Sequence, residues 1–207
     1  MAHITTIAAL RSRIPEANAP TLAKISTQLD DQARAFIQRA PLLFMATRDR
    51  DGGVDVSPKG DAPGFAQIED DTTLLLPERP GNNIALGLQN ILATRSIGLI
   101  FVLPGTGETF RVNGEASLHD DEDLLSRLGT PERPALLAIR VRILRCFFHC
   151  ARAFNRGKIW HPESWDAPQK ISFGRIISPR IGGDDNLAAM IDGFVAKADT
   201  EHLWKNS

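Results

Sequence analysis

The feature that most constrains the fold is a change in hydrophobic period near residue 41. Residues 21–39 show the 3.6-residue period of an amphipathic helix, with Leu29, Phe36 and Ile37 on one face. Pro41 follows and is expected to end that helix. Beyond it come short apolar or alternating runs separated by turn-forming clusters, a pattern typical of β-strands joined by tight turns.

About seven strands are predicted in this part of the chain, with short helices between and after them. The expected strands are 42–47, 54–57, 65–68, 72–76, 97–103, 109–118 and 136–148. Further helices are expected from about 80–83 to 92, over 121–128 and over 184–204. Strands joined by tight turns pair antiparallel, so the sequence predicts a mainly β chain with helices (α+β) that forms a small antiparallel barrel rather than a doubly wound sheet.

A chain of 207 residues is long enough for one substantial domain, and three segments are expected along it. Residues 1–40 are expected to form an N-terminal helical segment and residues 41–160 the barrel. Residues 161–207 are expected to form a C-terminal extension that contains a helix.

Composition argues against several classes of partner. The formal net charge of -1 gives no reason to expect nucleic acid or an anionic membrane, since both favour a basic excess. No apolar run approaches the roughly 20 residues of a spanning helix, and the N-terminus has no secretory pattern, so a cytoplasmic location is expected. Two cysteines, Cys146 and Cys150, are too few for a disulfide framework and fit a reducing compartment.

The first candidate for chemistry is the run Asp55-Val56-Ser57-Pro58-Lys59-Gly60-Asp61, at the end of a predicted strand. A hydroxyl, a cation and a glycine-bearing turn can supply hydrogen-bond donors to an anionic or carbonyl-rich ligand. The same residue types are common in turns, so a solvated strand end is the alternative and is favoured for this run in isolation.

The second candidate is the run Leu76-Pro77-Glu78-Arg79-Pro80-Gly81-Asn82-Asn83, which joins a predicted strand to a predicted helix. Pro80 suits a first-turn position and Asn82 or Asn83 could cap, which would leave exposed N–H groups that favour an anion. Arg79 could add a bidentate phosphate contact. An ordinary capped helix with a surface arginine is the alternative, again favoured for the segment alone.

Two later segments carry further candidates. Arg111 lies between hydrophobic neighbours on a predicted strand, where it either pairs with a carboxylate or faces a bound anion. Arg152, Arg156 and Lys158, followed by Trp160, form a basic run that suits a phosphate or an aromatic ring better than a metal.

Cys146, His149 and Cys150, with His161 nearby, raise the alternative of a zinc site. On an extended strand the two cysteines would lie about 13 Å apart, and no second ligand pair completes a tetrahedral set. Buried free cysteines are the favoured interpretation, and no metal is predicted. His149 is the one histidine within a candidate motif, and a buried strand histidine is at least as good an interpretation as a proton-transfer role.

Taken in order, these segments resemble the pyridoxamine 5'-phosphate oxidase-like family of FMN-binding split barrels. Within that family the chain is most similar to the branch of predicted flavin-nucleotide-binding proteins with a Ser-Pro-Lys-Gly-Asp motif. The resemblance runs from about residue 44 to residue 160. The segments on which the resemblance rests are Asp55–Asp61, Pro77–Asn83, Asn90–Leu92, Gly98–Phe101, Arg111–Gly114 and Phe148–Ala151.

The resemblance implies an antiparallel split β-barrel that forms a homodimer, with FMN sites at the interface built from both subunits. Val56, Ser57, Pro58 and Lys59 would run alongside the isoalloxazine and ribityl chain. Pro77, Arg79, Asn82 and Asn83 would surround the phosphate. Arg111, Arg156 and Trp160 would approach from neighbouring strands or from the partner subunit.

Two departures from the family pattern bear on the site. The family often has another arginine where this chain has Ile84, so the phosphate dianion would have less charge compensation. Either the affinity for the phosphate would be lower, or Arg79 and Lys59 would matter more. The family usually has serine after the position of Arg156, and this chain has Gly157, which removes a hydroxyl contact.

The function implied is that of an FMN-dependent oxidoreductase acting on a small molecule, with NADH or NADPH as a candidate electron donor. Two alternatives remain open: a non-catalytic flavin-binding or flavin-sensing dimer, and a related barrel that holds a deazaflavin or haem instead. Pyridoxamine phosphate oxidation itself is not predicted, because the C-terminus lacks the arginine- and histidine-containing tail that the true oxidases use for substrate. No catalytic residue is assigned.

Overall fold

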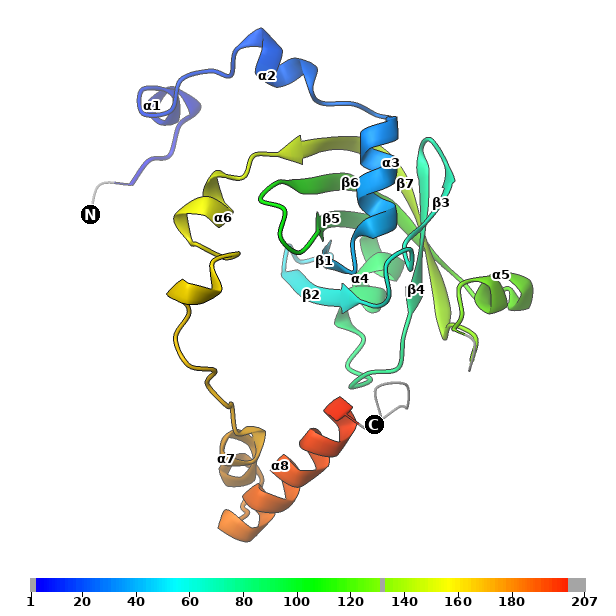
Figure 1. The fold of residues 1–207 in the computed structure, drawn as a ribbon, viewed down its shortest axis with the longest axis vertical. Coiled ribbons are helices and arrows are strands. Elements are labelled where there is room, and N and C mark those ends of the chain that lie inside the picture. The colour runs from blue at the N-terminus through cyan, green and yellow to red at the C-terminus, as the bar shows by residue number, and fades with distance from the viewer. Residues whose placement is uncertain (1–2, 131–132, 201–207) are drawn as a thin grey trace.

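The computed structural model describes residues 3–130 and 133–200 and shows one antiparallel seven-stranded sheet with helices around it (Figure 1). The strand order is β2-β1-β5-β6-β7-β4-β3, and every neighbouring pair is antiparallel. The sheet curls, but its edge strands β2 and β3 do not pair with each other, so the barrel is split rather than closed. The predicted fold class, an α+β split barrel, is confirmed.

The strands are β1 (Leu42–Arg48), β2 (Val54–Gly60), β3 (Gln67–Asp70), β4 (Thr73–Glu78), β5 (Ser96–Val102), β6 (Thr109–His119) and β7 (Leu137–His149). The helices are α1 (Ile7–Arg11), α2 (Ala19–Ala23), α3 (Asp31–Arg39), α4 (Leu86–Thr94), α5 (Glu122–Arg127), α6 (Arg152–Arg156), α7 (Phe173–Ile177) and α8 (Asp185–Thr200). Two 3₁₀ turns, η1 (Pro162–Ser164) and η2 (Ser178–Ile181), lie in the C-terminal segment. Each predicted strand is present, with bounds that shift by up to three residues.

The single helix predicted over residues 21–39 is wrong, because the structure has two helices there with an extended segment between them. In that segment the backbone of Ser26 exchanges two hydrogen bonds with Cys146 of β7, at 3.0 and 2.7 Å. Asp30 then begins α3, and its side chain accepts the N–H of Ala33 at 2.8 Å. A local N-cap and a long-range backbone pairing therefore override the helical period.

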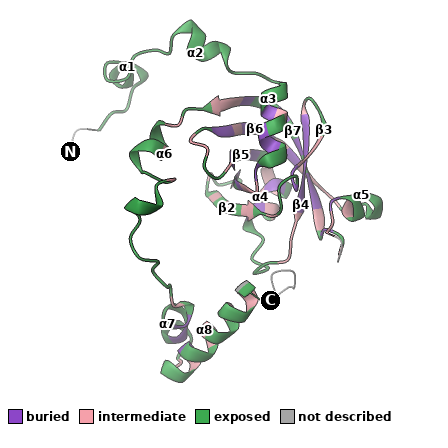
Figure 2. Ribbon diagram, in the orientation of Figure 1, coloured by how far each residue is buried: buried purple, intermediate pink, exposed green. Residues whose placement is uncertain are grey.

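The core lies between α3 and the concave face of the curled sheet (Figures 1 and 2). Phe36 of α3 meets Phe148 of β7 edge-on at a ring distance of 5.4 Å, and Phe110 of β6 lies 4.9 Å from Phe148. Phe101 and Leu99 of β5 are fully buried beside them. Alternate residues of β1, β5 and β6 thus pack inward, as the period of two predicts.

The segments before residue 26 and after residue 150 extend away from the barrel and are mostly exposed (Figure 2). Within the C-terminal segment α7 packs against α8, and Gly174 lies so close to Ala188 that a β-carbon on Gly174 would overlap the Ala188 carbonyl oxygen. The predicted helix over 184–204 is confirmed to residue 200, and its last part lies outside the described residues. Among the described helices none is long and apolar enough to cross a membrane.

Candidate functional site

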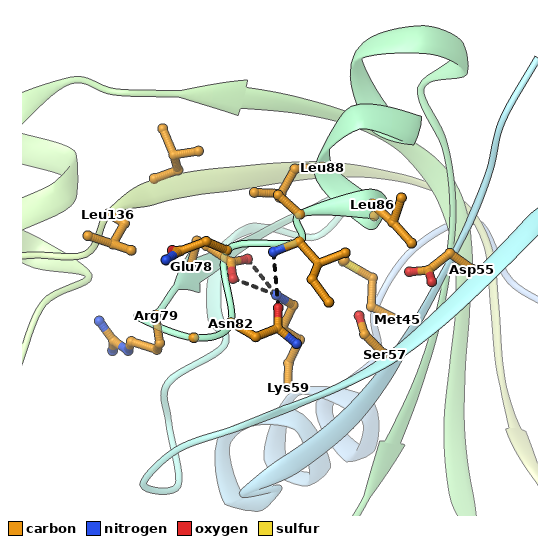
Figure 3. A pocket seen from close by; sticks show the side chains of 16 residues that line it. Met45, Asp55, Ser57, Lys59, Glu78, Arg79, Asn82, Leu86, Leu88 and Leu136 are labelled. Atoms are coloured by element: carbon orange, nitrogen blue, oxygen red, sulfur yellow. Dashed lines mark hydrogen bonds and ion pairs between the residues drawn. The ribbon is translucent and has the colours of Figure 1, made fainter. Parts of the chain in front are cut away.

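A cavity of about 340 Å³ opens in the split of the barrel, between β2, the end of β4 and α4 (Figure 3). β3 pairs with β4 only as far as Leu75, so the end of β4 is left to face β2. Met45 of β1 lies at the base of the cavity, and Leu86, Leu88 and Leu136 form apolar walls. The place where the sheet fails to close is therefore the place where a ligand can enter.

Alternation along β2 decides which of its residues reach this cavity. Ser57 and Lys59 line it together with Asp55, and all three are half-buried. Val56 and Pro58 point to the opposite face of the sheet and are exposed, so the structure does not bring them into the cavity. β2 continues to Gly60, beyond the predicted end at residue 57, and it accommodates Pro58 because it is an edge strand.

The loop between β4 and α4 supplies Arg79, Asn82 and Asn83 to the same cavity. The helix predicted to begin near residues 80–83 begins at Leu86 instead, so the expected capping by Asn82 or Asn83 is wrong. Asn83 and Ala85 adopt left-handed backbone conformations, with φ of 58° and 54°, which keep the loop out of the helix. Within this loop the side-chain oxygen of Asn82 accepts the N–H of Ile84 at 3.1 Å.

The first turn of α4 is held tightly against the sheet. A β-carbon on Gly87 would lie 2.9 Å from the Met45 methyl group, so only glycine fits at this position without displacing Met45. Asn90 donates a hydrogen bond of 3.1 Å to the buried hydroxyl of Thr47, which fixes the helix to β1. This contact gives Asn90, in one of the predicted motif segments, a structural role below the cavity.

Two ion pairs bridge the split from β2 to the end of β4. Lys59 contacts both carboxylate oxygens of Glu78, at 2.7 and 2.5 Å, within the cavity (Figure 3). Arg79 donates from Nε to Asp61 at 2.7 Å, and the Asp61 side chain is only 8% exposed. The two strands are thus joined by side chains where no backbone ladder joins them.

The charge lining the cavity is balanced. Lys59 and Arg79 contribute the cations, and Asp55 and Glu78 contribute carboxylates. The predicted anion-binding cations are therefore present, but each is already engaged by a carboxylate in the protein. Glu78 was not singled out from the sequence as a site residue, because its pairing with Lys59 depends on two strands that lie far apart in the sheet order.

The remaining predicted site residues do not line this cavity. Pro77 is buried in β4 opposite Ala138. Arg111 lies on β6 with its guanidinium 5.4 Å from the ring centre of Phe147. Arg156 is exposed at the end of α6, and Trp160 donates from its indole nitrogen to the carbonyl of Thr106, at 2.8 Å. The structure thus brings together Ser57, Lys59, Arg79, Asn82 and Asn83 of the predicted set.

The cysteines differ from each other in burial. Cys146 is buried, as expected, and burial raises the pKa of its thiol. Cys150 is exposed, so the expectation that both cysteines are buried is wrong for it, and His149 at the end of β7 is exposed too. Within residues 3–130 and 133–200 no group of three or more histidine, cysteine or acidic side chains is placed to hold a metal ion.

Comparison with known proteins gives one family and several similar folds. The family described as pyridoxamine 5'-phosphate oxidase matches residues 29–150, which are more than half of the chain. No curated protein matches.

Among solved structures, a variant of HupZ from Group A Streptococcus is 19% identical, covering 58% of this chain and 98% of that one, with a TM-score of 0.49. A candidate pyridoxamine 5'-phosphate oxidase from Lactobacillus delbrueckii is 24% identical, with coverages of 59% and 95% and a TM-score of 0.47. An FMN-binding protein from Syntrophomonas wolfei is 15% identical, with coverages of 57% and 84% and a TM-score of 0.44.

Proposed function

The chain belongs to the pyridoxamine 5'-phosphate oxidase family, and from that premise we propose that it is an FMN-dependent oxidoreductase acting on a small molecule. The observation that carries the proposal is the cavity in the barrel split, where Ser57, Lys59, Arg79, Asn82 and Asn83 converge. These residues come from two sequence segments, on β2 and after β4, that lie far apart in the strand order and that the curl of the sheet brings together.

The donor set of the cavity fits a flavin nucleotide. A phosphate needs cations and hydrogen-bond donors, which Lys59, Arg79 and the two asparagines supply. A flavin ring needs an apolar surface, which Met45 and Leu86 supply beside them. Bound FMN would supply the redox chemistry, while these residues would bind the cofactor and orient it.

Homodimer formation is part of the proposal, and the convex face of the sheet supports it. Phe44, Val56 and Ile100 share that face, since Phe44 pairs with Ile100 and Ala46 pairs with Val56, and all three are exposed. A contiguous exposed apolar patch marks an interaction surface. A second subunit there could also bring Arg111, Arg156 or Trp160 toward the cofactor, which one chain by itself does not do.

The test is to release and identify the small molecule from purified protein by mass spectrometry, after recording its absorbance spectrum. FMN is expected, with a stable dimer by light scattering and a buried interface above about 2,000 Å². A Soret band, a deazaflavin or a colourless protein that binds no added FMN would contradict the flavin proposal. A monomer with FMN bound would contradict the dimer.

The second candidate is a non-catalytic flavin-binding or flavin-sensing dimer. It is favoured by the chemistry of the cavity, because the described residues that line it include no histidine or cysteine, and Lys59 and Glu78 are engaged with each other. Turnover of NADH or NADPH with an added acceptor separates the two, since only the oxidoreductase would consume the nucleotide catalytically.

A further inference from the structure

The two ion pairs that bridge the barrel split differ in how they are placed. Lys59 and Glu78 both line the cavity, and their side chains are 20% and 16% exposed. Arg79 also lines it, but its partner Asp61 does not and is more deeply buried. A ligand in the cavity would therefore contact both charges of the Lys59–Glu78 pair but only the cation of the Arg79–Asp61 pair.

Glu78 occupies the position that an incoming anion would take at Lys59. Both of its oxygens contact the ammonium group, at 2.7 and 2.5 Å, as a phosphate oxygen would (Figure 3). A ligand phosphate can reach Lys59 only by displacing this carboxylate or by sharing the cation with it. We propose that Glu78 is an intramolecular competitor for Lys59 and sets how strongly the cavity binds a phosphate monoester.

Charge balance gives the direction of the effect. With Glu78 ionised, each cation of the lining is paired, Lys59 with Glu78 and Arg79 with Asp61, and Asp55 adds a further carboxylate, so a phosphate dianion gains no net attraction. With a neutral residue in place of Glu78, Lys59 has lost its carboxylate partner and can rotate toward the ligand. A competitor of this kind lowers the affinity for dianionic ligands relative to neutral ones. Glu78 would do so without contacting any part of the ligand other than its phosphate.

Asp61 provides the matched comparison. Its carboxylate engages Arg79 from outside the cavity, so it does not stand where a ligand phosphate would. Asp61→Asn releases the Arg79 cation without opening a place for the ligand, and a smaller gain in phosphate affinity than that of Glu78→Gln is expected. Removing one partner of so buried a pair leaves the other charge uncompensated and destabilises the fold. Both pairs bridge the barrel split, so Glu78→Gln and Asp61→Asn compare the loss of a bridging carboxylate inside the cavity with the loss of one outside it.

The experiment titrates Glu78→Gln, Asp61→Asn and the wild type with inorganic phosphate, with chloride at equal ionic strength as the control for screening. Affinity is read from the rise of the melting temperature with ligand concentration. Glu78→Gln is expected to bind phosphate about tenfold more tightly than the wild type. Lys59→Met in the Glu78→Gln background is expected to abolish that gain. If Glu78→Gln folds poorly, Glu78→Asp is used instead. It keeps the negative charge but shortens the side chain, so a gain in phosphate affinity of less than about tenfold is expected.

Binding of FMN at this cavity rests on the proposed function, and titration with two flavins tests whether Glu78 competes with the FMN phosphate as well. FMN is expected to bind Glu78→Gln about tenfold more tightly, and riboflavin, which lacks the phosphate, equally to both proteins. Equal phosphate affinity in Glu78→Gln and wild type, or an equal gain for riboflavin, would overturn the competition. If phosphate binding gains while neither protein binds FMN, the competition stands and the flavin proposal fails.

Discussion

The barrel and the segments that extend from its ends use their apolar residues differently. In the barrel, Leu99, Phe101 and Phe110 are buried against side chains that come from distant parts of the sequence. In the C-terminal segment, Phe173 and Phe194 are about half exposed although they lie on helices. The family match, over residues 29–150, covers the barrel and leaves the two extended segments outside it.

This difference extends to the candidate site. The five predicted residues that converge on the cavity all come from the barrel, on β2 and the loop after β4. Arg156 and Trp160, which were predicted for the same cofactor, belong to the segment beyond it and lie elsewhere. A single chain therefore supplies the barrel part of the proposed site, and Arg156 and Trp160 would reach it only from the second subunit of the proposed homodimer.

The largest effect on stability is expected when a phenylalanine of the barrel is replaced, and a phenylalanine of the C-terminal segment serves as the comparison. Phe101→Ala is expected to lower the free energy of unfolding by about 3–5 kcal/mol, because it removes a fully buried ring beside Phe110 and leaves a cavity. Phe173→Ala, at a residue that is 47% exposed, should cost less than about 1 kcal/mol. Urea unfolding measures both. Similar losses would mean that the C-terminal segment is as deeply packed as the barrel, in a partner if not in its own chain.

The strands could be predicted from the sequence because their information is local. Residues 97–103 form an apolar run and residues 109–118 alternate in hydrophobicity, on either side of a Pro-Gly turn, and β5 and β6 lie within one residue of these bounds. The helix predicted over 21–39 fails because Ser26 pairs with Cys146, some 120 residues later in the chain, and no local pattern reports that contact.

The sequence allowed residues of the site to be predicted, but not which of them form ion pairs with each other. The motifs around Lys59 and Arg79 are visible as runs of donors and cations. That Lys59 meets Glu78, and Arg79 meets Asp61, follows from the curl of the whole sheet, which brings β2 to the end of β4 without a backbone ladder. Closure of this kind is a non-local property, so composition and spacing alone do not determine it.

Arg79→Ala is the next effect in size and tests whether the barrel part of the site binds the phosphate. FMN binding should weaken by roughly 1.5–3 kcal/mol, or about ten- to a hundredfold, near the upper end because Ile84 cannot replace the lost cation. Riboflavin should bind wild type and variant almost equally. The measurement is flavin titration of reconstituted apoprotein.

Loss of Arg79 also leaves the buried Asp61 carboxylate without its ion pair, so stability will fall for a reason unrelated to ligand binding. Arg79→Ala in an Asp61→Asn background removes both charges and controls for this. The two backgrounds should lose the same amount of FMN affinity. An unchanged FMN affinity, or an equal loss for riboflavin, would show that Arg79 does not bind the phosphate.

Removal of residues 161–207 should have a smaller effect on the barrel. The contacts that hold α7 and α8 lie mainly within their own segment, and the buried residues of the main core cluster all lie between residues 29 and 146. The barrel's free energy of unfolding should change by less than about 1 kcal/mol. Differential scanning calorimetry of the shortened and full chains measures it, with dimer content checked by light scattering. A loss of several kcal/mol that accompanies dissociation would place the C-terminal segment in the subunit interface.

The smallest expected effect is an acid response confined to the C-terminal segment. The Ser172 hydroxyl and the Gly174 N–H donate to the Asp192 carboxylate, at 2.5 and 2.7 Å, and these bonds lower the pKa of Asp192. A carboxyl whose folded pKa is depressed contributes stability above its unfolded pKa of about 4 and loses it as the pH falls through the folded value. Contact between α7 and α8 should therefore be constant from neutral pH to about pH 5 and loosen below about pH 4.

Hydrogen exchange of the Gly174 amide, expressed as a protection factor at each pH, reports this contact directly. In Asp192→Asn the protection should be lower at neutral pH and should fall less on acidification. Asp184 lies in the same segment, and its pKa is lowered by the hydrogen bond from the Leu187 N–H. Asp184→Asn therefore controls for the contribution of Asp184 to the acid response. Core amides of β5 should keep their protection at the pH where Gly174 loses it. Simultaneous loss in both regions would mean that the segment and the barrel unfold as one unit, and the distinction between them would fail.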